Sequence, residues 1–308
     1  MSTDPNPFLT ELVIIMKKLG LATALLLAMT GAQAYQFEVQ GQSEFIDASD
    51  ANDKDFTGGI QGTYYLKDVD TSKGPLAEAA FLNQASNVSL AYNYAELGTD
   101  GTDFIAHNYG AKAEAYIPTK VVPVYASASY SHTILDGKNN QTADQNGDRY
   151  AVEVGALATP NFLVAVGYTS VADQFALDAF NVMSNGVVKA VGETATINED
   201  QDAITARTKY VGAIDGTNMA IGFETNLLFA EYKAYSLKTD LFVNPKLSVG
   251  VSYAESSFAG TPDSAWGANV NYFITPAVAV GASYVNANAK EVVNLDTQTV
   301  GVNAKFRF

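Results

Sequence analysis

Cysteine is absent from this chain of 308 residues, so neither a disulfide nor a thiolate metal site is present. Only two histidines, His107 and His132, and one tryptophan occur. Basic residues are also scarce, because 18 Lys and Arg stand against 33 Asp and Glu, for a net charge of −15. Nucleic-acid binding requires a basic footprint, so nucleic acid is excluded as a partner.

Long apolar runs are missing as well, since a membrane-spanning helix needs about 20 apolar residues and no such stretch occurs after residue 34. A shorter run over residues 19–29 follows Met16-Lys17-Lys18 and precedes Ala32-Gln33-Ala34. This order of basic, apolar and small residues predicts a secretory signal peptide over residues 16–34. Residues 1–15 lie outside the pattern and are interpreted as an upstream extension from a misplaced start. The mature domain is then residues 35–308.

Aromatic residues, in contrast, are abundant, with 17 Tyr and 16 Phe, and apolar residues alternate with polar ones along most of the chain. The last nine residues, 300–308, show this most clearly. Their even positions are apolar, whereas Asn303, Lys305 and Arg307 lie between them. A period of two predicts a β-strand with one apolar face and one polar face.

Similar alternation recurs and gives fourteen candidate strands. They lie near residues 35–40, 56–66, 88–94, 109–115, 124–130, 149–154, 162–168, 204–210, 219–223, 235–241, 247–253, 266–272, 278–284 and 300–308. Bacterial single-chain outer-membrane barrels have an even number of strands.

The connections between these strands alternate in length. Short turns carry Pro118, Pro160, Pro245 and Pro276, or Asp215-Gly216. Longer polar segments separate them, at residues 47–55, 98–103, 134–148, 172–200, 256–263 and 286–294. A β-sandwich has no reason to sort its loops in this way. The sequence therefore predicts an all-β, transmembrane, antiparallel up-and-down barrel of about 14 strands, with short periplasmic turns and long outer loops.

If the apolar residues face lipid, the alternate polar positions face the lumen. A bare Arg or Lys facing lipid near the midplane costs about 2–4 kcal/mol, which a watery lumen removes. The predicted pore-lining residues carry both signs of charge. They are Lys112, Glu114, Arg149, Glu153, Arg207, Lys209, Glu224, Lys238, Asp240, Lys305 and Arg307.

Two segments break the strand pattern. Residues 172–200 form the longest connection, and long loops of this kind are often functional. We expect this loop to fold inward as a constriction between Arg149, Glu153, Arg207 and Lys209, although packing on neighbouring outer loops is the alternative. The residues assigned to it are Asp173, Phe175, Asp178, Phe180, Lys189 and Glu193. Residues 74–82 have helix-forming composition after Pro75 and are expected either in the periplasmic mouth of the barrel or as a surface turn.

Catalytic and metal-binding patterns are weak. Ser131 adjoins His132, but neighbours on a strand point to opposite faces, so the sequence predicts no enzyme. The acidic stretches at residues 50–53 and 144–148 lack the full ligand spacing of a calcium loop and are interpreted as solvated outer loops.

The signal peptide, the segment Gly74-Pro75-Leu76-Ala77-Glu78-Ala79-Ala80-Phe81 and the terminal Phe308 together resemble the general bacterial porins. Within that family, the chain is similar to the small carbapenem-associated porins of non-fermenting Gram-negative bacteria. The resemblance covers residues 16–308, and its terminal Phe is shared by most outer-membrane barrels.

The resemblance implies passive diffusion of water, ions and small polar solutes without a cofactor. It also implies contact with outer-membrane lipid and lipopolysaccharide, and recognition of the last strand by the barrel-assembly machinery. It singles out no selectivity residues, so the pore-lining assignment depends on alternation alone. An alternative stays open at this point: paired charges fill the lumen, and a plugged barrel contacts host or envelope proteins through its outer loops.

Overall fold

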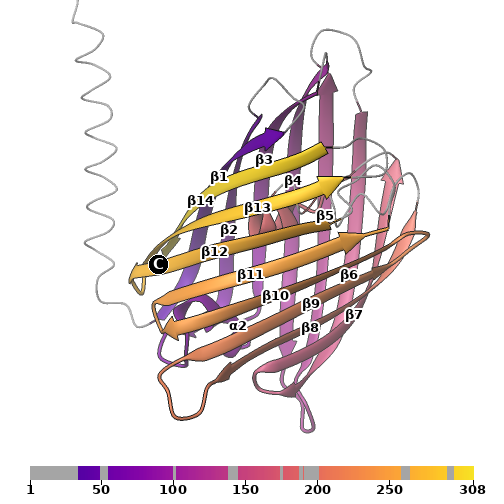
Figure 1. The fold of residues 1–308 in the computed structure, drawn as a ribbon. Helices are drawn as coiled ribbons and strands as arrows, with labels where there is room; N and C mark the ends of the chain where they lie inside the picture. The colour runs from indigo at the N-terminus through magenta and orange to yellow at the C-terminus, as the bar shows by residue number, and fades with distance from the viewer. Residues whose placement is uncertain are drawn as a thin grey trace, which may run out of the picture.

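A closed ring of antiparallel strands forms the protein (Figure 1). The computed structural model describes residues 34–48, 55–99, 102–137, 145–173, 176–186, 190, 201–257, 264–289 and 295–308. Within these residues there are fourteen strands, and each pairs with its neighbours along the chain. β1 (Ala34–Ala48) pairs with β14 (Leu295–Arg307) and closes the ring. The prediction of a 14-stranded up-and-down barrel is confirmed.

Each of the fourteen stretches of alternation corresponds to one observed strand, and most strands extend beyond the predicted bounds. The other strands are β2 (Asp55–Asp70), β3 (Asn87–Thr99), β4 (Thr102–Ile117), β5 (Val124–Gly137), β6 (Gln145–Thr159), β7 (Phe162–Asp173), β8 (Asp202–Ala213), β9 (Ala220–Phe229), β10 (Lys233–Asn244), β11 (Leu247–Ser256), β12 (Ser264–Thr275) and β13 (Val278–Ala289). The signal peptide and the upstream extension, residues 1–33, lie outside the described residues.

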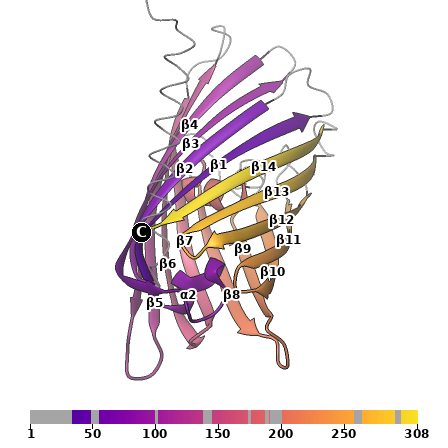
Figure 2. The same ribbon diagram turned by 90° about the vertical axis from the view of Figure 1, so that its left-hand side faces the viewer.

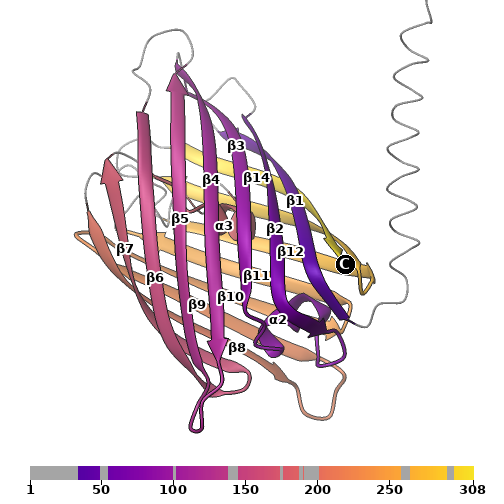
Figure 3. The same ribbon diagram turned by 180° about the vertical axis from the view of Figure 1, so that it is seen from behind.

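Three short helical segments accompany the strands in the described part of the chain. The 3-10 turn η1 (Leu76–Glu78) continues into α2 (Ala79–Leu82), and α3 (Ala179–Asn185) lies between β7 and β8 in sequence. Figure 3 shows α3 among the strands at mid-height and α2 at the rim near the C-terminus. None of the helices in the described residues has the length and apolarity required to cross a membrane.

Apolar side chains cover the outside of the barrel, as alternation predicts. On β14, Val300 and Val302 are each 55% exposed. Lys305 and Arg307 of the same strand form ion pairs with Glu38 of β1 inside the barrel. Trp266 and Tyr284 pack together on the outer surface with ring centroids 5.3 Å apart, an arrangement suited to a membrane interface.

The alternation begins later than predicted, because Tyr35 faces inward. It is 4% exposed and packs with Tyr65 and Val69, whereas Phe37 is 52% exposed on the outside. The β1–β2 pairing shifts register between Tyr35 and Phe37. Between these two residues β1 advances by two positions while β2 advances by five, from Val69 to Tyr64, so the regular strand pairing is interrupted next to Tyr35. Sequence alternation alone does not reveal the shift.

The two rims of the barrel have different connections. The proline-containing turns at residues 118–123, 160–161 and 276–277 lie at the same rim as the start of β1 and the end of β14, and η1–α2 lies there too (Figure 2). We call this the rim with the chain ends. At the opposite rim, two connections are shorter than expected. Residues 98–99 and 102–103 belong to strands, and β9 and β10 are joined by residues 230–232. At these positions polar residues continue the strands, because inter-strand hydrogen bonds satisfy their backbone N–H and C=O groups.

Candidate functional site

Most of the charged positions predicted to face inward gather around two cavities that share lining residues. The first has a volume of about 250 Å³ and lies toward β5–β9, and the second has a volume of about 420 Å³ and lies toward β8–β14. Arg149 and Glu153 border the first cavity only. Lys112, Arg207 and Glu224 border both. The second cavity is also bordered by Glu114, Lys209, Lys238, Asp240 and Lys305.

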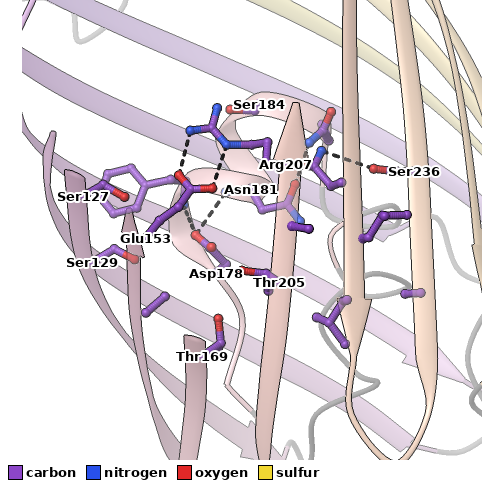
Figure 4. Close-up of a pocket in the computed structure, with 18 of the residues that line it drawn as sticks. Ser127, Ser129, Glu153, Thr169, Asp178, Asn181, Ser184, Thr205, Arg207 and Ser236 are labelled. Atoms are coloured by element: carbon purple, nitrogen blue, oxygen red, sulfur yellow. Dashed lines mark hydrogen bonds and ion pairs between the residues drawn. The ribbon is translucent and has the colours of Figure 1, made fainter. Parts of the chain in front are cut away.

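Arg207 and Glu153 form a bidentate ion pair on the wall of the first cavity (Figure 4). Arg207 Nε donates to Glu153 Oε1 at 3.0 Å, and a terminal nitrogen donates to Oε2 at 2.7 Å. The two residues lie on β8 and β6, and their side chains meet across β7. The β7 residues that face inward between them, Ala165 and Gly167, are small enough to leave the space. Charge-assisted pairs with two parallel hydrogen bonds are strong and geometrically defined.

A second group of charges lies nearer the rim with the chain ends. Lys209 Nζ lies 2.9 Å from Glu78 of η1 and 3.7 Å from Glu224 of β9. Glu114 of β4 accepts a 2.6 Å hydrogen bond from the Tyr125 hydroxyl and pairs with Lys112 at 3.1 Å. These side chains are half-buried, so opposite charges stay close together while still bordering the second cavity.

Two further pairs complete the charged lining. Lys238 lies 3.6 Å from Asp240 on the same strand, β10. Lys305 lies 3.0 Å from Glu38. The predicted pore-lining residues thus face the interior, and each of those just described has a partner of opposite charge.

Arg307 differs from the other predicted pore-lining residues because it borders neither cavity. It is 2% exposed, pairs with Glu38 at 2.8 Å and donates a 2.8 Å hydrogen bond to the Leu76 carbonyl. Its guanidinium also lies over the rings of Tyr35 and Phe273, at 4.5 and 4.6 Å. Arg307 therefore anchors η1 inside the rim.

The η1–α2 segment crosses the mouth of the barrel at the rim of the chain ends. Its Leu76 amide donates to the Pro245 carbonyl in the β10–β11 turn at 2.8 Å. Phe81 of α2 packs in an apolar cluster with Tyr125, Leu157 and Phe242, which come from three different strands. Ties to opposite sides of the ring place this segment across the opening. The alternative of a surface turn is excluded.

The α3 segment lies inside the barrel, against the part of the wall formed by β1, β3 and β4. Asn93 donates to the Ala179 carbonyl at 3.0 Å, and Asn108 donates to the Leu177 carbonyl at 3.2 Å. Gln40 and Gln42 of β1 donate to the carbonyls near the end of α3, at 3.0 and 2.8 Å. Inward-facing amides thus satisfy the backbone groups of a segment that would otherwise carry them unpaired.

Glycines on the inner wall provide the room for α3. A Cβ added to Gly110 would lie 2.6 Å from the Cβ of Ala179, and one added to Gly59 would lie 2.6 Å from the sulfur of Met183. Gly186 ends the helix at φ +86°, a conformation that favours glycine. The wall and the segment are therefore complementary in shape.

The residues assigned to the inward loop are distributed as follows. Asp178 caps α3 by accepting hydrogen bonds from the amides of Phe180 and Asn181, at 2.9 and 3.2 Å. Phe180 is buried against the inner wall. Asp173 is the last residue of β7, and its side chain is exposed. Phe175, Lys189 and Glu193 lie outside the described residues.

Sequence reasoning missed several interior residues. Glu38 lies on the polar parity of β1, and its position between Gln36 and Gln40 marks it as inward-facing, yet its pairing with Lys305 and Arg307 depends on barrel closure. The sequence presents Glu78 only as part of a helix-forming segment. Its pairing with Lys209 joins residues remote in sequence, so no local pattern reveals it.

Both histidines lie on outward-facing positions. His107 lies 2.9 Å from the Tyr92 hydroxyl, and His132 Nδ1 lies 2.8 Å from Asp148 Oδ1. Ser131, the sequence neighbour of His132, is buried on the inner side, where its hydroxyl accepts a hydrogen bond from the Ala179 amide. The serine and histidine therefore face opposite sides of the wall.

Comparison with known proteins agrees with this geometry. A family profile described as "Putative general bacterial porin" matches residues 9–308. Among solved structures, the chain is similar to the Acinetobacter baumannii outer membrane protein Omp33. The identity is 54%, the TM-score is 0.68, and the match covers 90% of this chain and 100% of that one. The predicted resemblance to the general bacterial porins is confirmed, and the profile match begins at residue 9 rather than at the expected residue 16.

More distant structures share the fold alone. The monoaromatic hydrocarbon channel CymD is 10% identical, with a TM-score of 0.56 and 89% of each chain covered. A TodX deltaS2S3 mutant, also a monoaromatic hydrocarbon channel, is 9% identical, with a TM-score of 0.52 and 90% and 91% covered. No curated protein sequence matches the chain.

Proposed function

The chain belongs to the general bacterial porin family, and from that premise we propose how its barrel passes small polar solutes through the outer membrane. Solutes diffuse through the two cavities, which α3 narrows from the outer side and η1–α2 covers on the periplasmic side. Outer-membrane barrels carry their short turns on the periplasmic side. The rim with the chain ends, which carries the proline turns, is therefore assigned to the periplasm. The single observation that carries this proposal is that two cavities with charged linings lie inside the barrel and share lining residues, among them Lys112, Arg207 and Glu224.

The residues that border the cavities act as the pore lining in this proposal. Arg207 is central because it borders both cavities and is held by Glu153 on one side and approached by Glu224 on the other. Asp178 and Phe180 fix α3 as a narrowing element, and both border the first cavity. Arg307 acts as an anchor of η1 and not as a lining residue.

The η1–α2 segment acts as a movable cover in this proposal. It is a short piece of helix, and its polar ties to the barrel are the Glu78–Lys209 ion pair, the Arg307 hydrogen bond to the Leu76 carbonyl and the Leu76 amide hydrogen bond to the Pro245 carbonyl. Release of these contacts opens the mouth.

A plugged interaction barrel is the second candidate, and the same η1–α2 segment favours it. With that segment fixed, the interior has no exit at the periplasmic rim, and function passes to the outer loops. Those loops would then contact host or envelope proteins. Channel measurements separate the two candidates.

Several further assignments belong to this proposal. Residues 16–34 direct export, and residues 1–15 take no part in the mature protein. The outer face contacts lipopolysaccharide as well as lipid, and the barrel-assembly machinery recognises β14 with its terminal Phe308. The Phe308 backbone pairs with Phe37 at the closure of the ring. We assign no catalytic role, because both histidines face outward.

The experiment is conductance of the purified protein in planar bilayers, together with liposome swelling in small sugars and amino acids. The wild-type protein is expected to give ion current and swelling. Deleting Asp178–Val191 removes the narrowing element and is expected to enlarge the current. If neither form gives current or swelling, and the barrel binds a host protein, the plugged alternative holds.

A further inference from the structure

The larger cavity has two chemically different walls. Toward β8–β10 it is lined by the charged pairs described above. Toward β11–β14 the lining is uncharged apart from Lys305, which is paired with Glu38, and it consists mainly of Asn, Ser, Gly and Ala residues together with Phe273 and Val285. We call the residues Asn269, Asn271, Asn303, Ser252 and Ser283, with the glycines between them, the amide wall.

Glycines allow the asparagine side chains of the amide wall to lie flat against the inner surface of the barrel. A Cβ at Gly281 would come within 2.3 Å of Asn271 Oδ1 and 2.8 Å of the Asn303 amide nitrogen. A Cβ at Gly250 would come within 2.7 Å of the Asn269 amide nitrogen. The amide groups therefore occupy space that side chains on these strands would otherwise fill. They present donors and acceptors to the cavity while leaving its volume open.

The charges that line this cavity cancel. The acids are Glu44, Glu78, Glu114, Glu224 and Asp240. The bases are Lys112, Arg207, Lys209, Lys238 and Lys305. Five negative and five positive side chains give a net charge of zero, although the whole chain carries −15. The acidic excess of the protein thus lies outside this cavity.

From this arrangement we infer that the cavity is a subsite for small electroneutral polar solutes, namely zwitterions or polyhydroxylated molecules, which pass along the amide wall. An ion that enters the cavity meets equal numbers of acidic and basic side chains, so the lining favours neither sign of charge, and the ion still gives up part of its hydration. A neutral molecule with both donors and acceptors exchanges its water for amide and hydroxyl groups. A volume of about 420 Å³ is in the range of small-molecule sites. This inference depends on the proposed channel function.

The first test is liposome swelling with matched solutes of one size: glucose, its amine glucosamine and its acid glucuronate. Serine, ethanolamine and glycolate provide the zwitterionic set. We expect the electroneutral member of each set to pass about two- to fivefold faster than either charged member, the range that one exposed charge interaction produces. A preference for the cationic member would instead assign control to the acidic exterior and would overturn the inference.

Charge substitutions in the amide wall give the second test. Asn303→Asp is expected to favour glucosamine over glucuronate, and Asn303→Lys the reverse, each by a similar factor. Asn218 lies exposed in the β8–β9 turn, outside the cavity, so Asn218→Asp and Asn218→Lys are matched controls. If the Asn218 variants change selectivity as much as those at Asn303, the cavity does not select.

The glycine substitution Gly281→Ala gives a third test, because it pushes the Asn271 and Asn303 amides into the cavity. It is expected to slow glucose more than glycine, since the larger solute meets the narrowed passage. Gly62→Ala is the control, because a Cβ there has no neighbour within 4 Å. Equal passage of neutral and charged solutes overturns only this inference, whereas no passage of any solute overturns the proposed function itself.

Discussion

Replacing Glu78 by glutamine tests whether η1–α2 is held over the periplasmic mouth by its ion pair with Lys209. The substitution keeps the shape of the side chain and removes its charge. Lys209 Nζ lies 2.9 Å from the Glu78 carboxylate, and both side chains are largely buried, with exposed fractions of 22% and 16%. Lys209 retains Glu224 at 3.7 Å, so the cation is not left alone.

The expected magnitude follows from this geometry. At 2.9 Å and an effective dielectric constant of about 20, the Coulomb energy of the pair is about 6 kcal/mol before desolvation is subtracted. Exposed pairs contribute about 0–1 kcal/mol net, and breaking a fully buried one costs about 3–5 kcal/mol. For this intermediate pair, with Glu224 in reserve, we expect a loss of about 1–2 kcal/mol, which raises the equilibrium constant for release about 5- to 30-fold.

The assay is single-channel recording in planar bilayers, with open probability as the readout. Asp240→Asn is the matched control, because it also removes one carboxylate from the same cavity but breaks a pair with Lys238 on β10. Glu78→Gln is expected to raise open probability, whereas Asp240→Asn is expected to leave it near the wild-type value. Equal behaviour of the two variants would refute the idea that the Glu78–Lys209 pair holds the cover.

Three further predictions concern the anchors of the two internal segments. Gly110→Val places a branched side chain where Ala179 and Phe180 now pack, so α3 is expected to detach and conductance to rise, whereas Gly62→Val, on the outer face, is expected to change neither. Arg307→Met leaves Glu38 with Lys305 as its single basic partner and is expected to destabilise the barrel by about 2–4 kcal/mol. The measurement is the temperature at which heat-modifiable migration on gels is lost, which should fall. An unchanged temperature would contradict the anchoring role. Asp178→Ala removes the cap of α3 and is expected to cost about 1 kcal/mol, which faster protease cleavage of the loop would report. Ser184→Ala, at an exposed position of the same helix, is the control.

Much of the fold follows from local pattern. All fourteen strands correspond to stretches of alternation, and the proline turns mark their ends correctly. The side of the wall that each charged residue faces was also predictable, because a period of two leaves only one choice once lipid is assigned to the apolar side. Tyr35 is the exception, because the β1–β2 register shift next to it interrupts the alternation and no residue in the sequence marks that shift.

The partners of those inward residues were not predictable. Glu153 and Arg207 are separated by 54 positions in sequence, and Glu38 meets Arg307 only because the two ends of the chain pair. Alternation assigned Arg307 to the pore lining, but the structure buries it beneath η1. A segment that crosses the ring covers residues far from it in sequence.

The sequence by itself determined the strand number, the lipid-facing surface and the charged interior, because each depends on whether a side chain contacts lipid or water. Only the tertiary structure decided where η1–α2 and α3 lie, and therefore which inward residues border open space. That decision depends on glycine-sized gaps and on hydrogen bonds from Asn93, Asn108, Gln40 and Gln42, which exist only after the sheet has curved and closed.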